Sequence, residues 1–283
     1  MTRPAASPLP LTRALRIARL PLLLALLVYL GAAAYMAAFQ RDFLYKPAPA
    51  WIDPAGQNLP GAARAELTMA DGTRLLGWRI EPQSPEKPVF LYFHGNANGL
   101  DRRARRFGLM TADGSGLLAM SYRGYGGSAG NPREATLIAD ARAIYDDLAR
   151  RVPPERIVIF GESLGTGVAL ELARQVKAKA VILDSPYYSV LRRAEASYPW
   201  LPVAWLLVDD FRSDLRIGAV DEPILILHGA ADTLIPPAVS EALAARGRPG
   251  RVKRILYPGE GHVVPYDRGP DRDVPAFLAE LAP

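Results

Sequence analysis

The chain of 283 residues contains no cysteine and only three histidines. Without cysteine it has no disulfide bond, no thiolate metal site and no cysteine nucleophile. The histidines, His94, His228 and His262, are scattered along the sequence and have no paired carboxylates beside them, so their spacing does not fit a metal site. We therefore expect neither a metal nor another cofactor.

A strong excess of one charge is also missing, since the formal net charge is only +5. A hydrophobic share of 49% supplies a core and excludes global disorder. Arginines cluster on one predicted helix, but no aromatic residues or binding motif accompany them. We interpret them as a solvated helix face and expect no nucleic-acid partner; they are Arg102, Arg103, Arg105 and Arg106. The glycines within residues 122–128 precede no Gly-Lys-Ser/Thr, so they indicate tight turns rather than a phosphate loop.

Residues 20–39 form a long apolar run without a charge. About 20 apolar residues in a helix cross the hydrocarbon core of a bilayer. Four arginines precede the run and only two basic residues closely follow it. The positive-inside rule then predicts a cytoplasmic N-terminus over residues 1–19, a single membrane anchor, and a domain on the outer, periplasmic or extracytoplasmic side. The alternative is a cleaved signal peptide and a secreted domain, although the run is longer than a usual h-region.

Beyond a proline-rich linker at residues 40–64, short apolar stretches alternate with helical patterns. Strands are predicted at residues 65–69, 74–80, 89–93, 116–122, 157–160, 180–183, 224–227 and 254–257, and helices at 100–110, 134–150, 164–176, 237–245 and 274–281. This alternation predicts one α/β domain over residues 65–283, with a mostly parallel sheet and helices on both faces. Residues 187–221 depart from it and are expected to form a small cap.

One predicted strand ends in Gly161-Glu162-Ser163-Leu164-Gly165, and a helical pattern follows at once. This order is typical of a nucleophile elbow, in which a serine occupies a sharp strand-to-helix turn. Gly161 and Gly165 are small enough for strand and helix to approach each other. The turn would aim the Leu164 N–H and the positive end of the helix at a carbonyl oxygen that becomes negative.

A serine hydroxyl is a poor nucleophile until a base takes its proton, and the base is usually oriented by a carboxylate. His262 lies in a glycine-rich loop after the last predicted strand, where the chain order serine, acid, histidine requires the base. We prefer Asp232 as the acid, on the loop after the preceding strand. Asp184 also ends a strand and is the competitor, although a structural hydrogen-bonding role suits it better.

The other two histidines receive different roles. His228 ends a strand and is expected to pack and shape the turn that follows. His94 precedes the serine, so chain order argues against it as the base. The loop that it begins, His94-Gly95-Asn96-Ala97, follows an early strand and should supply the second N–H of an oxyanion hole, with Asn96 as the expected donor.

Five segments in this order resemble the α/β-hydrolase superfamily over roughly residues 44–283: residues 93–97, 121–128, 161–165, 227–232 and 259–262. The set is similar to the "bud emergence" type of α/β-hydrolase-domain proteins, many of which carry one N-terminal membrane span. Residues 41–47 and 198–202 also resemble that group. By this resemblance Ser163, Asp232 and His262 form the triad, and Asn96 and Leu164 the oxyanion hole.

These patterns predict a membrane-anchored serine hydrolase that cleaves carboxylic esters or thioesters through an acyl-enzyme. An amidase or peptidase with the same triad is an alternative, and so is a non-catalytic, membrane-tethered binding module on a hydrolase fold. The expected partners are the bilayer, through residues 20–39, and a small-molecule or lipid-like acyl substrate. Aromatic residues of the cap are expected to line an apolar acyl pocket that favours medium chains: Tyr187, Tyr188, Trp200 and Trp205.

Overall fold

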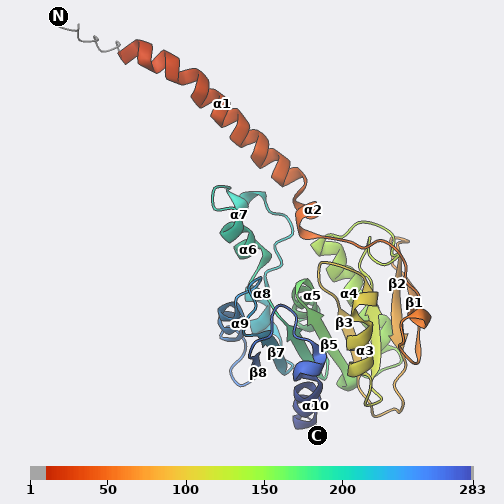
Figure 1. The fold of residues 1–283 in the computed structure, drawn as a ribbon. Helices are drawn as coiled ribbons and strands as arrows, with labels where there is room; N and C mark the ends of the chain where they lie inside the picture. The colour runs from red at the N-terminus through yellow and green to blue at the C-terminus, as the bar shows by residue number, and fades with distance from the viewer. Residues whose placement is uncertain (1–10, 282–283) are drawn as a thin grey trace, which may run out of the picture. The chain divides into compact units, whose positions relative to one another are not determined.

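The computed structural model describes residues 11–281, which divide into two compact units between Gln40 and Arg41. The first unit contains helix α1 (Leu11–Ala38), drawn in red in Figure 1. Its stretch Arg19–Ala38 is long and apolar enough to cross a membrane, judged by length and composition. The beginning of the predicted basic segment, residues 1–10, lies outside the described residues.

The second unit is built on one eight-stranded sheet (Figure 1). The strands are β1 (Ala62–Thr68), β2 (Arg74–Ile80), β3 (Val89–Phe93), β4 (Gly116–Met120), β5 (Ile157–Glu162), β6 (Ala180–Asp184), β7 (Ile224–Gly229) and β8 (Val252–Tyr257). Their order across the sheet is β1-β2-β4-β3-β5-β6-β7-β8. Strands β3 to β8 run parallel, whereas β2 pairs antiparallel with both β1 and β4. The carboxyl ends of the parallel strands therefore share one edge, where α/β proteins place their ligands.

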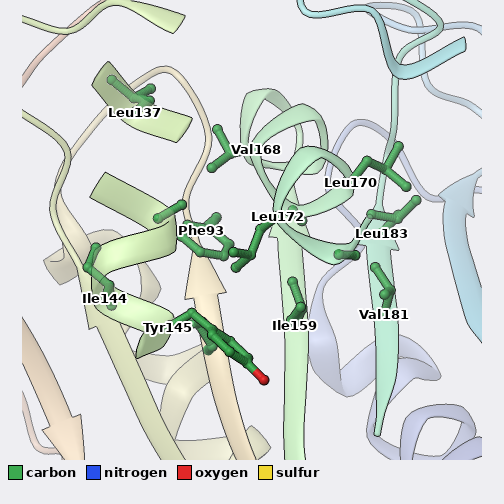
Figure 2. Close-up of a cluster of buried hydrophobic side chains, with 14 of the residues drawn as sticks. Phe93, Leu137, Ile144, Tyr145, Ile159, Val168, Leu170, Leu172, Val181 and Leu183 are labelled. Atoms are coloured by element: carbon green, nitrogen blue, oxygen red, sulfur yellow. The ribbon is translucent and has the colours of Figure 1, made fainter. Parts of the chain in front are cut away.

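Helices cover both faces of the sheet. They are α3 (Ala104–Met110), α4 (Glu134–Ala149), α5 (Leu164–Ala173), α9 (Pro237–Ala244) and α10 (Pro270–Glu280). Side chains of α4, α5 and α9 belong to one buried cluster, and side chains of α3 and α10 to a second. Figure 2 shows the first cluster, in which Leu137 and Ile144 of α4 and Val168 and Leu172 of α5 lie near the strands.

The two clusters arise because successive side chains of a central strand lie on opposite faces of the sheet. In β5, Ile157 and Ile159 enter the first cluster, and Val158 and Phe160 enter the second. Successive side chains of a strand point to opposite faces, so a strand with helices on both sides must be apolar at every position. Burial on both faces explains why these strands appear in the sequence as continuous apolar runs. The predicted α/β fold with a mostly parallel sheet is confirmed.

Shorter elements connect these layers. They are α2 (Gln40–Leu44), α6 (Val190–Ser197), α7 (Val203–Leu206), α8 (Ser213–Arg216) and the 3₁₀ turns η1 (Pro54–Gly56), η2 (Leu100–Arg103), η3 (Pro154–Arg156), η4 (Ile217–Ala219) and η5 (Tyr266–Arg268). Helices α6 to α8 and η4 occupy the predicted cap, between β6 and β7. The Arg41 guanidinium donates to the Asp209 carboxylate at 2.9 Å, which ties the start of the second unit to this segment.

Most element boundaries differ from the sequence prediction by a few residues, and two of the differences change how a segment is described. The helix predicted at 100–110 is divided into η2 and α3, and β1 begins at Ala62, inside the predicted linker. The predicted hairpin between β1 and β2 is present. Its turn needs the positive φ of Gly72, +80°, and the Asp71 carboxylate accepts the Thr73 N–H at 3.0 Å.

Candidate active site

Ser163 is the single residue between the end of β5 and the start of α5, in the strand-turn-helix arrangement that the sequence predicts. Its φ of +49° and ψ of −116° are unusual for a residue with a side chain, and such strain is typical of functional sites. A Cβ on Gly161 would lie 2.6 Å from the Gly165 carbonyl oxygen, and a Cβ on Gly165 would collide with the Phe93 carbonyl. Only glycine at these positions lets β5, α5 and β3 approach closely enough to form the turn.

The structure brings the three predicted side chains together although they are far apart in sequence. The His262 Nε2 lies 2.9 Å from the Ser163 Oγ, and its Nδ1 lies 2.8 Å from the Asp232 Oδ2. Each side chain follows a different parallel strand, β5, β7 or β8, at its carboxyl end. This geometry lets a neutral imidazole donate from Nδ1 to the carboxylate and accept the serine proton at Nε2.

Asp232 is held from the side opposite His262. Its Oδ1 accepts the backbone N–H groups of Leu234 and Ile235, both at 2.8 Å, and its side chain is fully buried. His228 packs below it, with Nε2 at 2.8 Å from the Ile235 carbonyl oxygen and 3.3 Å from Asp232 Oδ2. Burial lowers the pKa of His228, so this imidazole is neutral and donates to the carbonyl.

Asp184, the competing acid, has other partners. Its Oδ2 accepts from the Arg106 guanidinium at 2.6 Å, and its Oδ1 accepts from the Val264 N–H at 3.2 Å. Arg106 also donates to the Val264 carbonyl at 2.5 Å. Since Val264 is two residues beyond His262, this buried pair fixes the loop that carries the histidine. Asp184 thus lies near the site but contacts its supporting loop rather than the imidazole.

The two predicted oxyanion donors belong to different segments, Leu164 to the start of α5 and Asn96 to the loop after β3. Leu164 is the first residue of α5, and N–H groups in the first turn of a helix have no partner within the helix. In the described part of the chain, no residue accepts the Asn96 backbone N–H. The Asn96 peptide is held by its other atoms: its carbonyl accepts from the Tyr125 hydroxyl at 2.8 Å, and its side chain donates to the Leu44 carbonyl at 2.9 Å.

A buried ion pair between Arg103 and Glu162 holds the loop that carries Asn96. Arg103 donates to the Glu162 carboxylate from Nε at 2.9 Å and Nη2 at 2.5 Å, and to the carbonyls of Ala97 and Gly99. The Gly95 N–H also donates to Glu162. Burial raises the pKa of Glu162, but the charge and hydrogen bonds of Arg103 outweigh it and lower that pKa to about 2. The residue before the nucleophile is therefore ionised and anchors the loop that carries Asn96.

The interpretation of the arginine cluster as a solvated face is wrong for two of its members. Arg103 and Arg106 are only 8% and 9% exposed, whereas the side chains of Arg102 and Arg105 are 76% and 79% exposed. The sequence shows the helix but not the carboxylates of β5 and β6 that lie beneath it. The sequence does indicate that Arg103 and Arg106 belong together, because residues three apart share one face of a helix.

His94 has the structural role left open by the sequence. Its Nδ1 donates to the Gly95 carbonyl at 2.7 Å, and its Nε2 accepts the Tyr122 N–H at 3.1 Å. Burial and then the charge of Arg103 lower the pKa of His94 to about 3. His94 is therefore a neutral imidazole whose two hydrogen bonds join the loops after β3 and β4.

The aromatic residues of the cap separate into two pairs. Tyr187 is buried and donates to the Leu164 carbonyl at 3.2 Å. Together with Tyr188 it lines a cavity of about 470 Å³. Trp200 and Trp205 are 51% and 89% exposed and lie outside this cavity, because the short helix α7 buries only Val203. Of the four residues expected to line an acyl pocket, the two tyrosines line this cavity and the two tryptophans do not.

Within residues 19–281, no group of three histidine, aspartate or glutamate side chains is arranged to hold a metal ion. The chemistry available at the site is that of the serine, the imidazole, the carboxylate and the backbone N–H groups.

The sequence has relatives among known proteins. Residues 84–217 match the family model described as serine aminopeptidase, S33. An uncharacterized protein of Mycobacterium tuberculosis is 38% identical over 240 residues, which cover 83% of this chain and 85% of the relative. Alpha/beta hydrolase domain-containing protein 17C of Xenopus laevis is 33% identical over 229 residues, which cover 74% of this chain and 72% of the relative. The chain belongs to the α/β-hydrolase superfamily.

Further similarities of this α/β hydrolase cover different lengths. The lysophosphatidylserine lipase of Danio rerio is 33% identical over 179 residues, which are 56% of this chain but only 47% of the lipase. An esterase of Pyrococcus furiosus has a TM-score of 0.67 at 21% identity, covering 84% of this chain and 97% of the esterase, and it supports the fold alone. The predicted superfamily and fold are thereby confirmed, while the narrower "bud emergence" resemblance stays a prediction.

Proposed function

We propose that this α/β hydrolase is a membrane-anchored serine esterase or thioesterase. The observation that carries the proposal is the continuous chain of contacts from Ser163 through His262 to Asp232, at 2.9 and 2.8 Å. A chain that only bound a ligand would have no need for a strained serine in contact with an imidazole. The cofactor-free chemistry of such a site is acyl transfer to the serine and then to water.

In the first half-reaction, the Ser163 hydroxyl donates its proton to the His262 Nε2 as its oxygen attacks the substrate carbonyl. The buried Asp232 carboxylate stabilises the imidazolium that forms and keeps its ring oriented. The developing oxyanion accepts from the N–H groups of Leu164 and Asn96, and the positive end of α5 adds to this stabilisation. Each such donor is worth about 3–4 kcal/mol of the barrier in comparable enzymes.

The same half-reaction ends when His262 returns its proton to the leaving alcohol or thiol and the bond between the carbonyl carbon and the leaving group breaks, which leaves the acyl-enzyme; the second half-reaction begins with water. Water then donates a proton to His262 and attacks the acyl-enzyme, and collapse of the second intermediate releases the acid and restores the Ser163 hydroxyl. The buried pair of Arg103 and Glu162 keeps the Asn96 loop in one place through both steps, which is the condition for a preorganised oxyanion hole.

An aminopeptidase is the second candidate, because the family model that matches residues 84–217 carries that description. Such an enzyme must hold the α-ammonium group of a peptide, and a carboxylate is the natural partner for it. Among the described residues that line the cavity beside the site are Arg192 and Arg193, but no aspartate or glutamate. This charge favours an ester or thioester substrate over a peptide with a free amino terminus.

The length of the acyl chain should affect turnover of simple esters. We expect kcat/KM for p-nitrophenyl esters to rise from acetyl to medium chains, by up to about fourfold for each methylene that becomes buried. The cavity of about 470 Å³ lies within the range of roughly 300–1,000 Å³ that is usual for small-molecule sites. Rates on purified full-length protein test this expectation. Highest kcat/KM with acetyl and a steady fall beyond butyryl would exclude a medium-chain pocket.

We further propose that residues 20–39 anchor the protein and leave the catalytic unit on the outer side. The support is the apolar stretch of α1 and the four arginines before it. Protease added to intact spheroplasts of an expressing bacterium should digest the domain from Arg41 onward, while a cytoplasmic marker stays intact. Protection of the domain would overturn the orientation. Release of the domain into the medium would instead support the cleaved signal peptide.

A further inference from the structure

A groove runs between the cap and α9, and its lining includes Leu234 and Ile235 of the loop that follows Asp232. One wall consists of Tyr187, Tyr188 and the side of α6 that carries Arg192 and Arg193, and the other consists of Leu234, Ile235 and residues of α9. We call this cavity of about 470 Å³ the cap groove. Two of its residues contact the catalytic elements directly.

These contacts join two lining residues of the cap groove to the elements that carry Ser163 and Asp232. The Tyr187 hydroxyl donates to the carbonyl of Leu164, the residue after the nucleophile, at 3.2 Å. The Ile235 N–H donates to Asp232 Oδ1 at 2.8 Å. Tyr187 and Ile235 therefore belong both to the groove lining and to the packing around the elbow and the acid loop.

Two guanidinium groups of the groove lining, those of Arg192 and Arg193, have no carboxylate within ion-pair distance across the described part of the chain. Arg246 lies next to the groove, outside its lining, and its charge helps to lower the pKa of Asp214. Glu195 is on the same helix as the first two and pairs with neither. Asp214, whose backbone N–H donates to the Tyr188 carbonyl, is paired with Arg212 at 2.7 Å. The local charge is thus positive.

The arginines near the oxyanion loop offer a contrast. Each of them has a carboxylate within ion-pair distance, in the pairs Arg102–Asp101, Arg103–Glu162, Arg105–Asp267 and Arg106–Asp184. Of these, the buried Arg103 and Arg106 support the site, whereas Arg192 and Arg193 of the cap groove have no paired carboxylate and can bind an anionic ligand.

The ring of Tyr188 holds the guanidinium groups of Arg192 and Arg246 in place. The guanidinium carbons of Arg192 and Arg246 both lie 5.2 Å from the centre of the Tyr188 ring. A guanidinium above an aromatic ring is held by a cation–π contact, while the N–H groups at its edge remain able to donate. Arginine with free donors is the side chain best suited to the planar or tetrahedral oxygens of a carboxylate or phosphate.

We propose that the cap groove selects acyl substrates with an anionic group, a phosphate or a carboxylate, which Arg192 and Arg193 bind while the ester reaches Ser163. This rests on the proposed ester hydrolysis and adds the substrate class. The apolar side chains of Leu234, Ile235 and Val239 cover the hydrocarbon next to the anion. The favoured substrate is an anionic amphiphile, and a neutral ester of the same acyl length is a poorer one.

The test compares three substrates with one acyl chain on the full-length protein in neutral detergent micelles: a monoacylglycerol, its phosphate ester and its succinate ester. We expect the wild type to cleave the phosphate, the succinate or both with higher kcat/KM than the neutral lipid. The double variant Arg192→Gln, Arg193→Gln should lose about tenfold or more of kcat/KM on the favoured anionic lipid, mainly through KM, because a charged hydrogen bond is worth at least that factor. Its rate on the neutral lipid should change by less than about twofold.

The matched control is Arg142→Gln, Arg150→Gln. It removes the same two charges from exposed positions on or directly beyond α4, so a nonspecific effect of net charge would reduce both doubles alike. Equal cleavage of neutral and anionic lipids by the wild type would overturn the proposal, and so would an equal loss on all three lipids in the groove variant. Both results leave p-nitrophenyl ester hydrolysis intact and are thereby distinguished from failure of the proposed function, in which no ester of any kind is cleaved.

Discussion

Replacement of Ser163 by alanine should lower ester hydrolysis by at least about a thousandfold, because the Oγ is the only atom of that side chain that can form the acyl-enzyme. The backbone should be unaffected, since alanine and serine carry the same Cβ and tolerate the φ of +49° equally. Initial rates on a p-nitrophenyl ester measure the loss, and circular dichroism with thermal unfolding checks the fold.

A fluorophosphonate probe gives an independent result for the same variant. It should label the wild type and leave Ser163→Ala unlabelled. The matched control is Ser197→Ala, the same chemical change on the exposed end of α6, which should retain full rate and labelling. Residual activity of Ser163→Ala above about one-thousandth of the wild type would refute the nucleophile. A wild type that is neither labelled nor active on any ester would favour the binding module.

Replacement by asparagine should affect activity at Asp232 and stability at Asp184. Asp232→Asn presents an amide N–H to the His262 Nδ1, so the ring becomes protonated at Nε2 and cannot accept the serine proton. We expect kcat to fall by about 10⁴-fold, as for the equivalent change in serine proteases, with little loss of stability. Asp184→Asn instead leaves Arg106 without its carboxylate in the protein interior, and breaking such a pair costs about 3–5 kcal/mol.

Parallel measurements of kcat and of the free energy of unfolding separate the two roles. We expect Asp232→Asn to be folded and inactive, and Asp184→Asn to be destabilised yet active below its lowered melting temperature. Urea unfolding followed by fluorescence gives the stabilities, and rates at a temperature where both variants are folded give kcat. A folded Asp184→Asn with much less activity than Asp232→Asn would show that the acid is assigned to the wrong residue.

Short-range patterns predicted the elbow. Gly161 and Gly165 are needed because strand, turn and helix meet within a few residues, so the cause lies in neighbouring positions of the sequence. The same holds for the apolar strands, whose burial on both faces leaves a continuous apolar run. Ser163 and the order of strands and helices could therefore be read before any contact was known. The apolar stretch of α1 was equally readable, because length and composition are local properties.

The histidine and the acid needed one long-range assumption, that loops at the carboxyl ends of neighbouring strands meet. The assumption placed His262 and preferred Asp232, but Asp184 also ends a central strand and only its contact with Arg106 separates the two. Composition could not show this, because a carboxylate near a site has the same sequence pattern whether it orients a base or holds a loop.

The sequence by itself determined the fold class, the position of the serine and the long apolar segment near the N-terminus, all of which depend on residues close together in the chain. The tertiary structure alone decided which arginines are buried and which are not. Arg103 and Arg106 are turned inward by carboxylates 59 and 78 residues away, and Arg192 is stacked on Tyr188 opposite an arginine from beyond β7. A charged side chain is buried or left without a partner according to what folds against it, and that is a property of the packed molecule rather than of any segment.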